Sequence, residues 1–140
     1  MTSMSRLVMC ESAYRALVPL VARGATGRER VAWLHGIIEG PAVTVTAVEP
    51  TVNTHRCAGS FGIAASDLRQ ARASGTLVGL FHTHAGDSTP SAADLRLVRE
   101  SHLLQLIGSP GRPRQAIRLQ AFYCGGYGSI DTPRIEVSAP

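Results

Sequence analysis

The hydrophobic and polar positions along the chain fall into stretches that predict either helices or strands. Apolar residues recur at helical spacing in residues 11–23, whereas runs rich in Val, Ile and Leu predict strands. The predicted helices cover residues 11–23, 66–75 and 91 to about 103, and the predicted strands cover residues 29–40, 42–53, 76–84, 102–108, 114–124 and 133–138. This mixed order predicts an α/β (mixed α+β) fold in which helices flank one central sheet.

Local signals refine several of these elements. Pro19 is expected to interrupt or kink the first helix, and Ser66 and Gly75 are expected to cap the two ends of the second. The strand over residues 76–84 is almost entirely apolar, which predicts burial on both faces of a sheet. Residues 108–115 are rich in Gly and Pro and are interpreted as a flexible loop.

The size and charge of the chain narrow its class. With 140 residues, 44% of them hydrophobic, the chain is expected to form one domain over residues 1–140 with a single core. All 14 basic residues are arginines spread along the sequence, and the net charge is +4. No basic stripe is present, which argues against nucleic-acid binding. No apolar run approaches the roughly 20 residues of a membrane-spanning helix, so no membrane insertion is expected.

The three cysteines are widely spaced and form no CxxC pair. This spacing argues against a disulfide framework and against a cysteine-rich zinc finger, and it favours a cytoplasmic location. Cys57 and Cys124 lack charged neighbours that would mark a reactive thiolate, so both are interpreted as structural. The sequence leaves the oligomeric state open.

A His-x-His pair closes the apolar strand at residues 76–84. Residues i and i+2 of a strand point to the same face, so His82 and His84 are expected to aim their imidazoles at one point, with Thr83 on the opposite side. A catalytic zinc site needs a third protein ligand, usually a carboxylate, and one open position. Asp94 is the natural candidate, because a turn after the strand brings the next helix back over it.

Ser91 and Asp94 also have a purely structural interpretation. Ser91-Ala-Ala-Asp94 after Pro90 matches a capping box, in which Ser caps the helix and the acid three residues later returns to the Ser amide. This cap explains both residues without a metal. The stretch alone therefore leaves open whether it is a metal site or a strand, a turn and a capped helix.

The combination of motifs is more specific than its parts. His-x-His at the end of an apolar strand, followed by Pro-Ser-x-x-Asp at a helix start, resembles the JAMM or MPN-plus zinc metallopeptidase family. That family's pattern also has an upstream Glu with Gly seven positions on, and here Glu29 is followed by Gly36. As in the family, Asn53 and Phe61 precede a short helix and then the strand that carries His82 and His84. The resemblance covers roughly residues 11–123. Within the family, the chain resembles the minimal prokaryotic type.

The resemblance implies an MPN-like, cytidine-deaminase-like fold and a set of site residues. It implies that His82, His84 and Asp94 ligate Zn²⁺ and leave a fourth position for water. Glu29 would act as the general base, and the Ser91 hydroxyl would serve as helix cap, as oxyanion donor or as each in turn. The sequence departs from the family in two places: Ala85 replaces the usual Pro, and the loop from His84 to Ser91 is one residue shorter.

Other ionisable side chains fit less well. His35 alternates with apolar neighbours and is interpreted as a core or sheet-face residue. His102 lies at a helix end, where a histidine interacts favourably with the helix dipole. A surface role is favoured over a substrate contact for His55 in its loop. Glu39 and Glu49 compete with Glu29 as the base, and the Gly seven positions on favours Glu29.

The function implied by the resemblance is hydrolysis of a peptide or isopeptide bond at the Gly-Gly tail of a ubiquitin-like or sulfur-carrier protein, the tail lying beside a sheet edge. Isopeptidase action, C-terminal processing and amino-acid release all stay open. An alternative is a non-catalytic MPN-like binding module in which the shortened loop has disabled the site. A PHP-type phosphoesterase, suggested by His-x-His alone, is disfavoured because only 56 residues follow His84.

Overall fold

The structure, a computed structural model, describes residues 3–25, 27–55, 60–111, 117–125 and 128–138. Within these residues the chain forms three helices and one eight-stranded mixed sheet, which confirms the predicted mixed α+β fold. The helices are α1 (Glu11–Gly24), α2 (Ala65–Ala73) and α3 (Ala92–Ser101). The strands are β1 (Arg6–Cys10), β2 (Val31–Glu39), β3 (Ala42–Thr51), β4 (Leu77–Thr83), β5 (Leu104–Pro110), β6 (Ile117–Cys124), β7 (Ile130–Asp131) and β8 (Arg134–Ser138).

The strand order β7-β6-β5-β4-β2-β3-β1-β8 places β4 near the middle of the sheet. β2 and β3 form an antiparallel hairpin, and Gly40 adopts the φ of 57° that its turn requires. β4 pairs antiparallel with β2 and parallel with β5. A parallel pair needs a crossover, and α3 supplies it. The first turn of α3 therefore follows shortly after the carboxyl end of β4.

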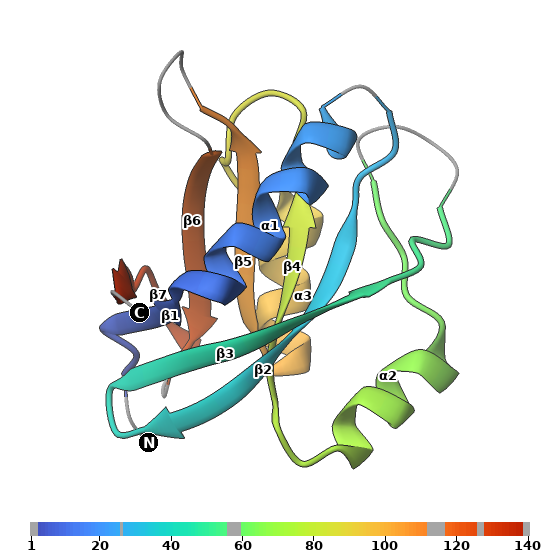
Figure 1. Ribbon diagram of the computed structural model, residues 1–140. Helices are drawn as coiled ribbons and strands as arrows, with labels where there is room; N and C mark the ends of the chain where they lie inside the picture. The colour runs from blue at the N-terminus through green and yellow to red at the C-terminus, as the bar shows by residue number, and fades with distance from the viewer. Residues whose placement is uncertain (1–2, 26, 56–59, 112–116, 126–127, 139–140) are drawn as a thin grey trace.

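The helices divide between the two faces of the sheet (Figure 1). α1 lies across one face, where Leu17 packs in an apolar cluster that includes Phe81 of β4. α2 and α3 lie over the opposite face, where they pack in clusters that include Leu80 and Ile107. Because side chains alternate along a strand, His82 shares the α2 and α3 face with Leu80, whereas Phe81 faces α1.

The sequence prediction missed β1 and β7. β1 has only five residues, and α1 follows it directly at Glu11, so its short alternating pattern merges with the helical one. In the sheet, β1 pairs in parallel with both β3 and β8, so contacts distant in sequence define it. β7 has two residues and pairs antiparallel with β6.

Several local predictions were also wrong. α1 continues through Pro19, so the predicted interruption is absent, and the alternative of a kink stays a prediction. α2 follows Ala64 and has no side-chain cap, so Ser66 is not its N-cap, whereas Gly75 follows the helix with a φ of 75°, as its predicted stop position requires. Residues 108–110 are the end of β5 rather than a loop. Residues 112–115 of that predicted loop lie outside the described residues.

Two predictions about composition can be compared with the structure. No helix in the described part of the chain is long and apolar enough to cross a membrane. Cys10 and Cys124 are free thiols, and Cys124 is buried in the cluster under α3, in agreement with a structural role. Cys57 lies outside the described residues.

Candidate metal centre

Two histidines meet at the carboxyl end of β4. His82 is the penultimate residue of β4 and is fully buried, and His84 follows the strand by one residue and is partly buried. Their Nε2 atoms lie 3.2 Å apart on one side of the strand. Thr83 points to the other side, where its Oγ1 accepts a hydrogen bond from the amide of Arg30. The prediction of convergent imidazoles is confirmed.

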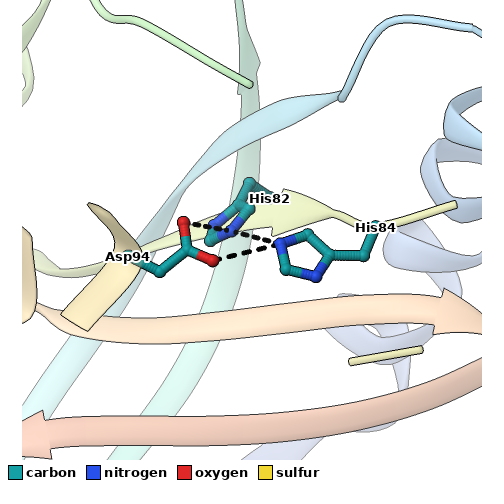
Figure 2. Close-up of side chains that lie close together, drawn as sticks. All are labelled: His82, His84 and Asp94. Atoms are coloured by element: carbon teal, nitrogen blue, oxygen red, sulfur yellow. Dashed lines mark hydrogen bonds and ion pairs between the residues drawn. The ribbon is translucent and has the colours of Figure 1, made fainter. Parts of the chain in front are cut away.

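The third member of the group comes from the first turn of α3. Asp94 Oδ1 lies 3.2 Å from His82 Nε2, and Asp94 Oδ2 lies 3.1 Å from His84 Nε2. Figure 2 shows the carboxylate facing both imidazoles. The predicted capping box is also present: Ser91 Oγ accepts from the Asp94 amide, and Asp94 Oδ2 accepts from the Ser91 amide. The helix cap therefore holds the carboxylate over the histidines.

The spacing and chemistry of these three side chains fit a small divalent cation. Four ligands about 2.0–2.1 Å from a tetrahedral zinc ion lie about 3.3 Å from one another. The two Nε2 atoms are 3.2 Å apart, His82 Nε2 lies 3.2 Å from Asp94 Oδ1, and His84 Nε2 lies 3.1 Å from Asp94 Oδ2. With one ligand atom taken from each residue, the three atoms lie within 4.8 Å of one another. Two ring nitrogens and one carboxylate match the donor set that zinc prefers at catalytic sites. Among the described residues, this is the group that could hold a metal ion.

The electrostatics favour the ligating protonation state in two of the three donors, His82 and Asp94. Burial lowers the pKa of His82, which favours the neutral imidazole that a metal needs. Burial opposes ionisation of Asp94, but hydrogen bonds from His82 and His84 outweigh it, so the pKa of this carboxyl lies well below its usual range. The hydrogen bond to Asp94 raises the pKa of His84 in the metal-free protein. A bound cation would replace that proton.

The shortened loop after His84 supports the site instead of disrupting it. His84 Nδ1 lies 3.2 Å from the carbonyl oxygen of Asp87, so its N–H donates there and leaves Nε2 free to bind a metal. The Asp87 side chain accepts from the amide of Thr89, and Ser88 is buried, so one internal hydrogen bond and one buried residue hold this otherwise exposed turn. The missing residue and Ala85 have not displaced the histidine.

His82 is held by stacking instead. The ring of Phe61 lies 4.3 Å from the ring of His82 at an interplanar angle of 30°. Nδ1 of His82 is buried and has no hydrogen-bond partner among the described residues. Phe61, singled out in the sequence only as part of a family pattern, therefore fixes the plane of a candidate ligand.

Glu29 lies beside the three candidate ligands, two residues before β2 begins. Its side chain is buried, with a relative exposure of 6%, and its Oε1 lies 3.7 Å from His84 Nε2. Burial raises the pKa of this carboxyl to about 7. A carboxyl that titrates near neutral pH can accept a proton and return it, which is the requirement for a general base. The sequence placed Glu29 at the start of a strand, and the strand begins at Val31.

Two hydrogen-bonding residues hold the backbone around Glu29, and the sequence assigned a role to neither. Asn53 is buried, and its Nδ2 donates to the carbonyl oxygens of Glu29 and Ser60. Thr83 binds both sides of Arg30, because its hydroxyl accepts from the Arg30 amide and its own amide donates to the Arg30 carbonyl. In the sequence Asn53 stood out only as part of the family pattern, and its burial and its bond to the Glu29 carbonyl are findings of the structure.

The remaining ionisable candidates do not reach the group. His35 lies on β2, bonded to Thr76 and Glu49, which agrees with a sheet-face role. Glu39 is exposed at the far end of β2. His102 is the C-cap of α3 with a φ of 56°. His55 is exposed and bonds to Ser60 and the Asn53 side chain, and its role stays a prediction.

Comparison with known proteins places this geometry in a family. The family of prokaryotic homologs of the JAB domain matches residues 11–122. The chain belongs to this family. The fold of this JAB-domain protein is similar to the solution structure of protein DSY2949 from Desulfitobacterium hafniense, with a TM-score of 0.75 and 23% sequence identity. The similarity covers 96% of this chain and 94% of the DSY2949 chain. That likeness shows the fold alone, and no curated protein matches the chain.

The match to the JAB family confirms the resemblance drawn from the motifs. The JAB domain family includes metallopeptidases, and His82, His84 and Asp94 are positioned like a metal site. In this JAB-domain protein, Glu29 and Ser91 lie against that group.

Proposed function

We propose that this JAB-domain protein is a zinc-dependent metallopeptidase that hydrolyses a peptide or isopeptide bond. The observation that carries the proposal is Glu29, a buried carboxyl with a pKa of about 7 placed 3.7 Å from a candidate ligand nitrogen. A structural metal site needs no such neighbour, because it closes its coordination with ligands alone. A buried carboxylate next to an open metal position has a clear use as a base.

The residues divide the reaction between them. Zn²⁺ held by His82, His84 and Asp94 would polarise the attacking water and the substrate carbonyl. Glu29 accepts one proton from that water as the oxygen joins the carbonyl carbon. The C–N bond then breaks, and Glu29 returns the proton to the leaving nitrogen, so the immediate products are a carboxylic acid and an amine. The second proton of the water then passes from the acid to the amine, which gives a carboxylate and an ammonium group at neutral pH. No oxidant or further reactant is needed.

Ser91 can act in this reaction without giving up its place in the helix cap. Its Oγ accepts from the Asp94 amide at 3.1 Å, which uses a lone pair and leaves the hydroxyl proton free. That proton would donate to the carbonyl oxygen as negative charge develops on it. The two roles that the sequence left open are compatible at one atom.

We infer that the substrate is the Gly-Gly tail of a ubiquitin-like or sulfur-carrier protein, as the resemblance implies. The sheet position changes how such a tail would bind. β4 has β2 and β5 as neighbours along its length, so no strand can be added beside the histidines. An extended tail would instead lie across the carboxyl end of β4, where a chain without side chains can approach the metal centre closely.

Metal analysis and one conservative variant test the proposal. Protein purified without chelator should contain about one zinc per chain and should cleave a ubiquitin-like protein extended beyond Gly-Gly. Glu29→Gln should keep the zinc and lose about 10²- to 10⁴-fold in turnover, the usual contribution of a general base. Glu39→Gln, at an exposed position far along β2, is the matched control and should keep full activity.

The alternative is a non-catalytic binding module. Absence of zinc together with retained binding of the intact carrier would favour it. Zinc with an unchanged rate in Glu29→Gln would instead exclude Glu29 as the base.

A further inference from the structure

A cavity of about 440 Å³ adjoins the metal centre on the α2 and α3 face of the sheet. This volume lies in the range of about 300–1,000 Å³ typical of ligand pockets. Glu29, Ser91 and Asp94 line the cavity at the metal centre, and most of its remaining wall is apolar. The apolar side chains are Trp33 of β2, Phe61, Ile63, Leu68 of α2, Leu80 of β4, Ala93 and Leu97 of α3, and Leu103, and the wall also includes the polar residues His55 and Ser60.

The helix α3 forms one side of this cavity through one stripe of its surface. Ala93, Leu97 and Ser101 recur at intervals of four residues and all line the cavity. Asp94 and Val98 are the buried residues of the helix, on the stripe next to it. The exposed side chains of Arg96 and Glu100 complete the rim, so the cavity opens to solvent beside the helix.

A buried amide without partners lies in the wall of the cavity. Gln105 of β5 lines it and has a relative exposure of 0%, yet neither its Nε2 nor its Oε1 has a hydrogen-bond partner among the described residues. A buried polar group without a partner costs about 1–3 kcal/mol. A cost of this kind is expected where a ligand supplies the missing partner.

The register of the sheet fixes where this amide lies relative to the metal centre. Gln105 pairs with Leu80, and His82 pairs with Ile107 two residues further along β5. Gln105 is therefore one inward-facing position, roughly 6.6 Å, from the level of His82. A side chain entering the cavity beside the metal centre needs about the length of a tyrosine to reach it.

We propose that this cavity binds the side chain of the residue that leaves after hydrolysis, and that it selects an aromatic residue with a polar end, such as tyrosine. The inference rests on the proposed peptidase function. Glycine residues on the carbonyl side of the bond have no side chain to fill a cavity. Glu29, the residue that returns a proton to the leaving nitrogen, lines the cavity. The leaving residue is thus the one whose side chain starts at its mouth.

A series of quenched peptides tests the selection. Each peptide carries Gly-Gly followed by Tyr, Phe, Leu, Ala or Gly, and the full-length zinc-loaded protein is used throughout. The Phe peptide should exceed the Ala peptide about 10- to 100-fold in kcat/KM, because its ring is buried in the cavity. The Tyr peptide should exceed the Phe peptide about 2- to 10-fold through the added hydrogen bond to Gln105.

Two variants and one control assign these preferences to the cavity. Gln105→Met keeps the length of the side chain and should remove the advantage of Tyr over Phe while Phe cleavage persists. Leu97→Phe fills the cavity and should remove the advantage of Phe over Gly. Arg99→Phe, an exposed position of the same helix that does not line the cavity, should leave the ratios unchanged. A purely structural role for Gln105 would lower all rates together.

Trp33 reports occupancy independently of catalysis. It is the one tryptophan of the chain and lines the cavity, so tyrosine amide and phenylalanine amide should shift its fluorescence saturably in Glu29→Gln, whereas alanine amide should not. Equal cleavage of all five peptides with no fluorescence shift would overturn the inference and leave the peptidase standing. A saturable shift without cleavage of any peptide by the unmodified protein would overturn the proposed function and support the cavity as an aromatic binding site.

Discussion

The two faces of the sheet are built from the same strands and are packed in different ways. On the α1 face, Leu17, Phe81 and Leu106 belong to a closed apolar core in which each is fully buried. On the α2 and α3 face, buried polar side chains interrupt the apolar ones. His82 and Gln105 are as buried as Phe81, and polar atoms of both lack partners among the described residues.

This difference separates the residues that stabilise the fold from those that serve the site. The α1 face follows the usual rule that buried polar groups are avoided, with Thr83 as an exception whose hydroxyl is hydrogen-bonded to Arg30. The opposite face breaks the rule at the metal centre and in the adjoining cavity. Buried polar groups that the fold does not satisfy mark positions where a ligand is expected.

Substitutions of the neighbours Phe81 and His82 test most directly whether the two faces of the sheet differ. Both are fully buried on β4, but they face opposite sides. Phe81→Ala should lower the free energy of unfolding by about 3–5 kcal/mol, because it leaves a void in a closed core. His82→Leu should lower it by only about 1–2 kcal/mol in metal-free protein, because burial of an apolar side chain partly offsets the loss of the hydrogen bond from His82 to the buried carboxylate of Asp94.

Urea unfolding with EDTA present measures both values. Zinc analysis supplies the converse readout: His82→Leu should lose the metal, and folded Phe81→Ala should keep it. Similar losses of stability in the two variants would show that the faces do not differ.

A second prediction concerns the stability cost of the buried base. The folded-state pKa of Glu29 is raised from 4.5 to about 7, so this residue favours the native state while protonated, and that contribution is lost as the pH rises from about 4.5 through 7. At about 1.4 kcal/mol per pKa unit, the ionised carboxylate destabilises metal-free protein by about 3 kcal/mol at pH 8. Glu29→Gln should therefore be more stable by about that amount at pH 8 and equal in stability at pH 4.

The pH series identifies the cause. Added zinc should narrow the difference at pH 8, because a cation near the carboxylate stabilises its charged form. A constant difference between pH 4 and pH 8 would instead indicate a packing effect of the amide.

The sequence alone was sufficient to predict the helices and strands that a local pattern of residues defines. The three helices and the hairpin of β2 and β3 follow from periodicity and turn residues, and all appear within a few residues of the predicted ranges. β1 was missed because its place depends on parallel pairing with β3 and β8, which are remote in sequence. The predicted interruption at Pro19 was wrong, since α1 continues through this residue despite the missing amide.

The residues of the site likewise divide into those that local pattern predicts and those that it does not. His82, His84 and Asp94 could be placed together because strand alternation and a helix start bring them to one point. The roles of Asn53 and Gln105 could not be predicted. The first depends on where the Glu29 carbonyl lies, and the second on which face of β5 borders a cavity. A glutamine inside the apolar run from Leu103 to Ile107 was the available sign.

The smallest stability effect is expected at Ser91, where substitutions can distinguish the role of the side chain in capping α3 from its role in catalysis. Ser91→Ala should cost about 1 kcal/mol of stability through loss of the cap, and Ser91→Gly only a few tenths, since glycine is tolerated at an N-cap. Both variants lack the hydroxyl donor, so both should lose about 10²–10³ in kcat if that donor binds the oxyanion. Ser91→Thr keeps cap and donor and should retain stability and most activity. If Ser91→Gly kept full kcat while Ser91→Ala lost it, the rate would follow the stability of α3, and Ser91 would act through the position of Asp94 instead of contacting the substrate.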